Sequence, residues 1–139
     1  MSAYPRAGNL AAYQTVATHG GVAASDPHGL IVMMLDGAME RIAAARGYMA
    51  NNVFSEKGRL IGRAAGIVDE LRISLDLVRG GTLAQNLEAL YDYIGRQLLR
   101  ANAENRLDLL DEVTGLLQEI RTAWIAIPAD ARTARAPGK

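Results

Sequence analysis

Residues 82–102, which read TLAQNLEALYDYIGRQLLRAN, form the most regular helical pattern in the chain. Their apolar residues recur at steps of three and four, and at about 100° per residue these steps place them in one stripe. The stripe consists of Leu83, Leu87, Leu90, Ile94, Leu98 and Ala101. Tyr91 lies at its edge, whereas Tyr93 and Leu99 fall outside it on opposite sides. The segment predicts a helix that turns one side to a core and keeps apolar residues for another contact.

Three other segments have the same period. Residues 26–50 begin with Asp26-Pro27, a good N-cap followed by a proline suited to the first turn. Residues 55–79 begin at Ser55 and end at Gly80-Gly81, after which Thr82 caps the next helix. Residues 105–127 begin at Asn105 and end before Pro128. The inward residues of these three segments are Ile31, Leu35, Ala38, Ile42, Ala45 and Met49, then Leu60, Ile61, Ala64, Val68, Leu71, Leu75 and Val78, and finally Leu110, Val113, Leu117, Ile120, Trp124 and Ile127.

The links between these segments are short, and short links make neighbouring helices antiparallel. The sequence therefore predicts an all-α fold, an antiparallel up-down-up-down four-helix bundle over residues 26–127. Residues 1–25 are rich in Gly and Ala without a sustained period, and we expect a loosely ordered segment. Residues 128–139 carry no apolar side chain larger than Ala or Pro and predict a disordered tail.

Composition excludes several classes of partner. The chain has 139 residues, enough for one domain, and its 15 basic residues balance 15 acidic ones, so it has no net field for nucleic acid. It has no cysteine for disulfides or thiolate metal sites. No stretch reaches the roughly eighteen apolar residues of a membrane span, and no secretion signal precedes the helices. We expect a cytoplasmic protein that does not insert into a membrane.

Catalytic and cofactor-binding groups are scarce. His19 and His28 lack the spacing of a metal site, and no Glu-x-x-His pair supplies a di-metal bundle centre. Adjacent carboxylates such as Asp69-Glu70 point about 100° apart on a helix, which is typical of a solvated face rather than an acid–base pair. The glycine pairs lack the strand and the Lys-Ser/Thr of a phosphate loop. The sequence predicts no enzyme activity, no metal and no cofactor.

The face of the 55–79 helix opposite its inward stripe carries a second row of residues. Gly62, Gly66, Ile73 and Leu77 follow one another at steps of four, seven and four. A glycine inside a helix costs about 1 kcal/mol relative to alanine, so close approach of another segment is one reason to keep two of them. The other interpretation is that they admit the chain's own N-terminal segment or an irregularly packed neighbouring helix of the bundle. For Tyr93 and Leu99, the alternative is ordinary surface exposure.

The beginning of the 26–50 helix is apolar on every side, Met33 included, and needs a cover from beyond the bundle. The preceding segment offers Leu10, Tyr13 and Val16, and we expect it either to dock there as a movable cover or to contact the partner directly. The candidate partner-binding residues are Leu10, Tyr13, Val16, Met33, Gly62, Gly66, Ile73, Leu77, Tyr91, Tyr93 and Leu99.

Several motifs resemble those of the flagellin export chaperones called FliS. They are SDPH at 25–28 followed by LIVMMLDGA, GG at 80–81, NLEALYDYIGRQLLRAN at 86–102 and DEVTGLLQEIRTAW at 111–124, with Tyr-x-x-Val at 13–16. Two positions depart from the family pattern: Asp26 stands where serine is usual before proline, and Leu35 stands where an aromatic residue is common.

This resemblance implies a cytoplasmic chaperone that binds the C-terminal segment of newly made flagellin. Binding would prevent premature polymerisation and deliver flagellin to the gate of the flagellar type III secretion apparatus. A homo-oligomeric helical-bundle adaptor that does not bind flagellin is the alternative, and the row on the 55–79 helix would then pair with itself in a weak homodimer.

Overall fold

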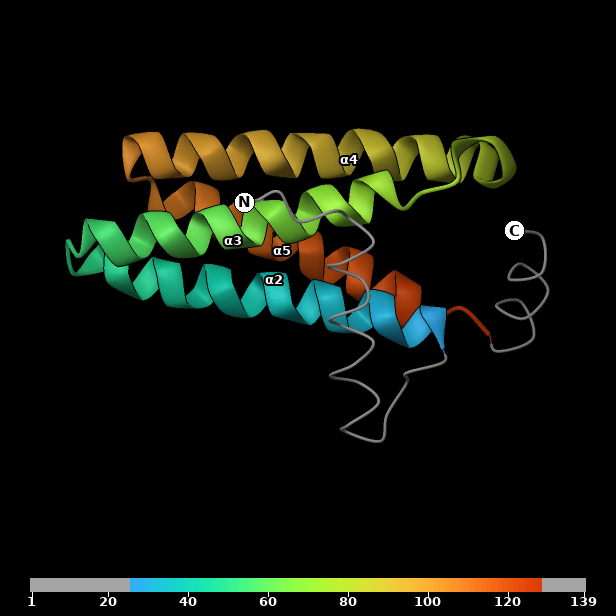
Figure 1. Ribbon diagram of the computed structural model, residues 1–139, viewed down its shortest axis with the longest axis horizontal. Helices are drawn as coiled ribbons and strands as arrows, with labels where there is room; N and C mark the ends of the chain where they lie inside the picture. The colour runs from blue at the N-terminus through green and yellow to red at the C-terminus, as the bar shows by residue number, and fades with distance from the viewer. Residues whose placement is uncertain (1–25, 129–139) are drawn as a thin grey trace, which may run out of the picture.

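The computed structural model describes residues 26–128, which form four helices. They are α2 (Pro27–Ala50), α3 (Phe54–Ile73), α4 (Leu77–Glu104) and α5 (Leu107–Ile125). Within this part of the chain there is no strand, so the prediction of an all-α fold is confirmed. In Figure 1 each helix runs opposite to the one before it, with α4 above α3 and α5 passing behind α3 towards the start of α2.

The four helices pack in a ring. α2 contacts α3 and α5, and α4 contacts the same two helices. Ion pairs confirm the opposed directions of α2 and α5, because Arg46 near the end of α2 meets Asp111 near the start of α5. Asp36, earlier in α2, meets Arg121, which lies later in α5. The ring encloses one core.

The core consists of the inward stripes of all four helices. Its largest fully buried side chains are Met34, Leu35, Ile42, Ile61, Leu71, Ile94, Leu98, Leu110, Leu117, Val68 and Val113. Burying such a side chain stabilises the fold by about 1.5–3 kcal/mol relative to leaving it exposed. Tyr91 also belongs to this core, and burial raises the pKa of its phenol to about 12.

The boundaries of α2 are those that the sequence predicts. Asp26 accepts a hydrogen bond from the backbone N–H of His28 at 3.0 Å, and Pro27 occupies the first helical position. The helix ends at Ala50. The next helix starts two residues earlier than predicted, at Phe54, because Val53 rather than Ser55 holds the N-cap position.

The boundary between α3 and α4 was predicted wrongly. The expected helix over residues 55–79 ends at Ile73, where the Ser74 hydroxyl bonds the carbonyl of Leu71. Asp76 then caps α4 by accepting from the N–H of Arg79 at 3.0 Å. This local cap outweighs the continuing apolar period. Leu77 therefore begins α4, and Val78, which was expected in the core, is 91% exposed.

Gly80-Gly81 breaks the helix, as the sequence predicts, but the turn before it, residues 77–80, belongs to α4 and not to the preceding helix. Gly81 has φ 58° and ψ −139°, a conformation that produces a kink and that favours glycine. Gly80 serves another purpose, because a Cβ atom placed there would lie 2.4 Å from the Cβ of Ala84. The two glycines thus bend the first turn of α4 relative to the rest of the helix.

The start of α5 also differs from the prediction. Asn105 is not its N-cap but the left-handed residue that closes α4, with φ 52° and ψ 52°. Arg106 holds the N-cap position, and α5 ends at Ile125, two residues before the predicted end. Asparagine tolerates this left-handed conformation better than most residues, which accounts for its place at the turn.

His28 and Trp124 join the start of α2 to the end of α5. Their rings stack, with centroids 5.0 Å apart and planes 11° apart. The indole Nε1–H of Trp124 donates to the carbonyl of His28 at 3.0 Å, and Nε2 of His28 lies 2.6 Å from the carbonyl oxygen of Trp124. Trp124, predicted to face the core, instead lies half-buried in this clamp.

We predict that Gly80→Ala lowers the free energy of unfolding by about 1–3 kcal/mol, because the new methyl group overlaps Ala84. Gly47→Ala is the control, since no atom lies within 4 Å of a Cβ there and alanine favours a helix. Urea denaturation followed by circular dichroism measures both. Equal stability of Gly80→Ala and the unmodified chain would contradict the tight approach of Gly80 to Ala84.

Candidate docking surface

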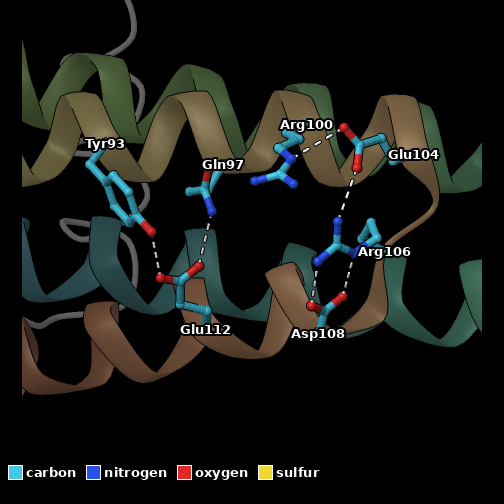
Figure 2. Close-up of polar contacts among 7 residues, drawn as sticks. All are labelled: Tyr93, Gln97, Arg100, Glu104, Arg106, Asp108 and Glu112. Carbon is cyan, nitrogen blue, oxygen red and sulfur yellow. Dashed lines mark hydrogen bonds and ion pairs between the residues drawn. The ribbon is translucent and has the colours of Figure 1, made fainter.

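Polar side chains on the α4–α5 face bond one another (Figure 2). The Tyr93 hydroxyl donates to Glu112 at 2.6 Å, and the Gln97 amide donates to the other oxygen of Glu112 at 3.0 Å. Nearer the α4–α5 turn, Arg106 lies between two carboxylates, at 3.0 Å from Glu104 and 2.7 Å from Asp108. These contacts connect the two helices on their solvent side.

The pKa shifts on this face follow from the same contacts. The hydrogen bond from Tyr93 lowers the pKa of Glu112, and the bond to Glu112 raises the pKa of Tyr93. The Arg100 guanidinium, followed by that of Arg106, lowers the pKa of Glu104. Each shift favours the form already present near neutral pH. These contacts therefore hold α4 and α5 together at the surface. They do not provide a proton donor or acceptor poised for acid–base catalysis.

Exposed apolar side chains form two groups at opposite ends of the bundle. One group, which we call the α3–α4 corner, consists of Ile73, Leu77, Val78 and Leu83. The other lies at the α2–α3 turn and consists of Tyr48, Val53 and Phe54. Leu99 on α4 and Ile125 on α5 are also exposed. The corner is the larger group, with four exposed large apolar side chains against three at the α2–α3 turn.

The outer face of α3 leads to this corner and is bare of side chains in its middle. Gly62 and Gly66 are exposed, and no atom lies within 4 Å of a Cβ placed on either. Neither glycine is therefore needed for packing against the described neighbours. Ile73, at the end of the same face, is 39% exposed. Another segment could approach the α3 backbone closely along this row.

The structure distributes the other predicted contact residues over different places. Leu99 is 61% exposed, and Tyr93 lies at the surface with its hydroxyl bonded to Glu112. Met33 on α2 is half-buried. Tyr91 is 4% exposed, so its ring serves the core and does not offer a surface. Leu10, Tyr13 and Val16 lie outside the described residues.

Leu77 does not complete the row that the sequence predicts, because it starts α4 instead of continuing α3. Sequence reasoning also missed the exposure of Val78 and Leu83, since both match the apolar period of their neighbours. The signal that could have revealed the earlier helix end is Asp76, an N-cap residue three positions before Arg79. The period of the apolar residues concealed it.

Other kinds of site have little support in residues 26–128. No group of three His, Asp or Glu side chains in this range could hold a metal ion. A hollow on the outer face of α5 is lined mainly by small residues, with Glu119 as its one carboxylate, and its described lining is Gly115, Gln118, Glu119, Thr122, Ala123 and Ala126. Across the same range, every helix is too short or too polar to span a bilayer.

Comparison with known proteins identifies relatives of this chain. Residues 9–131 match the family model described as "Flagellar protein FliS". A flagellar secretion chaperone FliSB of Pseudomonas aeruginosa is 46% identical over 115 residues, which cover 83% of this chain and 91% of the relative. Flagellar secretion chaperones FliS of Salmonella typhimurium and Vibrio cholerae are 38% and 35% identical, over 90% and 88% of this chain and over 93% and 90% of the relatives.

Proposed function

Since this chain belongs to the FliS family and is a flagellar secretion chaperone, we propose that its cargo is the C-terminal segment of newly made flagellin. The proposal rests on one observation beyond family membership. A bundle whose core is already filled by four stripes still leaves large apolar side chains on its surface, four of them at the α3–α4 corner. Groups of exposed apolar side chains typically mark binding surfaces.

The proposed mechanism is coverage of apolar surface without chemistry on the cargo. A flagellin segment that assembles through apolar contacts is kept from polymerising while those contacts are made to the chaperone. We place its contacts on Gly62, Gly66 and Ile73 of α3, where the cargo can approach the backbone, and on the adjoining corner. An amphipathic helix or an extended segment fits such a surface.

We propose that this binding takes place in the cytoplasm, where flagellin is made, and precedes delivery to the flagellar export gate. A cargo that passes a narrow channel must remain unfolded or readily unfolded until export. A preformed bundle that orders a flexible segment satisfies this need, because the segment gains structure only while bound.

The alternative is a homo-oligomeric adaptor whose exposed apolar residues pair with a second copy. The exposed row on α3 and the corner at its end are equally compatible with the adaptor hypothesis and with the flagellin-chaperone hypothesis. Light scattering with and without a peptide of the flagellin C-terminal segment separates the two. A monomer or weak dimer that forms a one-to-one complex supports the chaperone reading, whereas a stable oligomer that ignores the peptide supports the adaptor.

The direct test is isothermal titration of the full chain with that peptide. We predict that Ile73→Asp combined with Leu77→Asp weakens binding by about 2 kcal/mol or more, because charges replace apolar anchors. Val53→Asp is the matched control, since Val53 is 40% exposed and Ile73 39% exposed, at opposite ends of α3. Unchanged affinity in the double variant, with its helix content intact, would remove the corner from the binding surface.

We predict that Gly66→Ala stabilises the free chaperone and weakens its binding of flagellin. Alanine should raise the free energy of unfolding by roughly 1 kcal/mol, because Gly66 is inside a helix and nothing contacts its Cβ position. The methyl group should keep the cargo from approaching the backbone. Gly47→Ala, on α2, should stabilise the chain without changing affinity. If Gly66→Ala binds as well as Gly47→Ala, close approach at α3 is not required.

We propose that residues 1–25 cover the binding surface while it is empty. If they do, a chain that lacks residues 1–17 should bind the peptide more tightly, because the competing segment has been removed. Titration of this variant beside Tyr13→Ala in the full chain provides the measurement. Weaker binding in both variants would instead make Tyr13 a direct contact of the cargo.

A further inference from the structure

The outward row on α3 is interrupted by the break between α3 and α4. Gly62, Gly66 and Ile73 follow one another on one helix face, and Leu77 continues this spacing four residues later. A helix that continued through residues 74–76 would place Leu77 on the same face. In the structure, however, Leu77 opens α4 and the row stops at Ile73.

The turn from Leu77 to Gly80 is enclosed by two breaks in the backbone. Before it, Asp76 has φ −96° and ψ 95°, and after it, Gly81 has φ 58° and ψ −139°. The contacts that form the turn come from Asp76. Its carbonyl accepts from the N–H of Gly80 at 2.8 Å, and its carboxylate accepts from the N–H of Arg79 at 3.0 Å. The turn is therefore a short unit between two non-helical joints.

The two apolar side chains of this turn are exposed. Val78 is 91% exposed and Leu77 is 42% exposed, although both are large and apolar. Val78 lies seven residues after Leu71, so a longer α3 would turn it towards the core side of that helix. In the observed arrangement Leu77 and Val78 are exposed, whereas a longer α3 would place Leu77 on the outward row and turn Val78 towards the core.

We propose that binding of the flagellin segment transfers the turn at residues 77–80 from α4 to α3, an inference that rests on the proposed function. In the bound state α3 extends to Arg79, and the chain breaks instead at Gly80-Gly81. Leu77 then completes the row of Gly62, Gly66 and Ile73. The docking surface is assembled by the cargo that occupies it.

The backbone change that this step requires is local. Ser74 already has φ −76° and ψ −7°, close to a helical conformation. The residues to convert are therefore Leu75 and Asp76, which lie outside both helices, Asp76 with an extended backbone. Gly81 already has a positive φ, and a glycine pair accepts a helix end readily. The cargo biases the equilibrium because the completed row exists only in the extended state, and a ligand shifts a population only through such a difference.

Proline at position 77 distinguishes the two arrangements. Leu77 is the first residue of α4, where proline fits and its missing N–H is no loss, and Asp76 before it is already extended, as proline requires. In an extended α3, the same proline would remove a hydrogen bond and clash with the preceding turn. Leu77→Pro therefore fixes the observed state. Leu77→Ala is its control, because it removes the same side chain and permits both states.

The experiment measures peptide affinity and the backbone ¹³Cα shifts of residues 74–81 in the full chain. We expect Leu77→Pro to bind the flagellin peptide at least tenfold more weakly than Leu77→Ala. The shifts of Leu75 and Asp76 should become helical when the unmodified chain binds the peptide. Equal affinities of the two variants, or non-helical shifts in the complex, would overturn the proposal.

Failure of the proposed function gives a different result. If the unmodified chain does not bind the peptide, flagellin is not the cargo. The exchange of the turn between α3 and α4 is then tested by relaxation dispersion on the unbound chain. Relaxation dispersion at residues 75–81 that appears in the unmodified chain and in Leu77→Ala, and is absent in Leu77→Pro, supports two exchanging arrangements. A flat relaxation-dispersion profile at these residues in the unmodified chain would overturn the proposed exchange between the two arrangements.

Discussion

Burial of four apolar stripes in one closed core is the constraint on which the rest of the molecule depends. Each helix supplies a single inward face, and the ring of contacts leaves no side of the core open. Because protein interiors pack as densely as organic crystals, little of this core can be rearranged without a cost in stability. Adaptation to a partner is therefore confined to the outer faces and the connections. Those are the places where glycines and exposed apolar residues occur together.

Ion pairs join helices that are distant in sequence, but they contribute little to stability. Pairs such as Arg46 with Asp111 and Asp36 with Arg121 join helices that are distant in sequence, yet their side chains are about a third to a half exposed. Ion pairs of this kind contribute from zero to about 1 kcal/mol each.

The sequence was sufficient for the helical class and for most of the core, and it was insufficient at the connections. The stripe from Leu35 to Met49 was predictable because its period is regular and Asp26-Pro27 marks its beginning. The end of α3 was not, since Leu75 and Val78 keep the period while the carboxylate of Asp76 forms a local cap. Gly80-Gly81 does break the helix, but the turn before it belongs to α4 and not to α3. The stacking of His28 on Trp124 joins residues 96 positions apart, which no local pattern reveals.

The clamp between His28 and Trp124 makes the helical ring nearly cyclic. It holds the first turn of α2 against the last turn of α5, so the two ends of the bundle proper are neighbours in space. Nothing in the packing then distinguishes one helix as the first. A circular permutant that joins residues 26 and 128 by a short linker and opens the chain at the exposed Asn51-Asn52 turn would keep the same ring, because permutation is tolerated where ends are close and the new break lies in a surface turn. Connectivity and architecture are separable in this bundle.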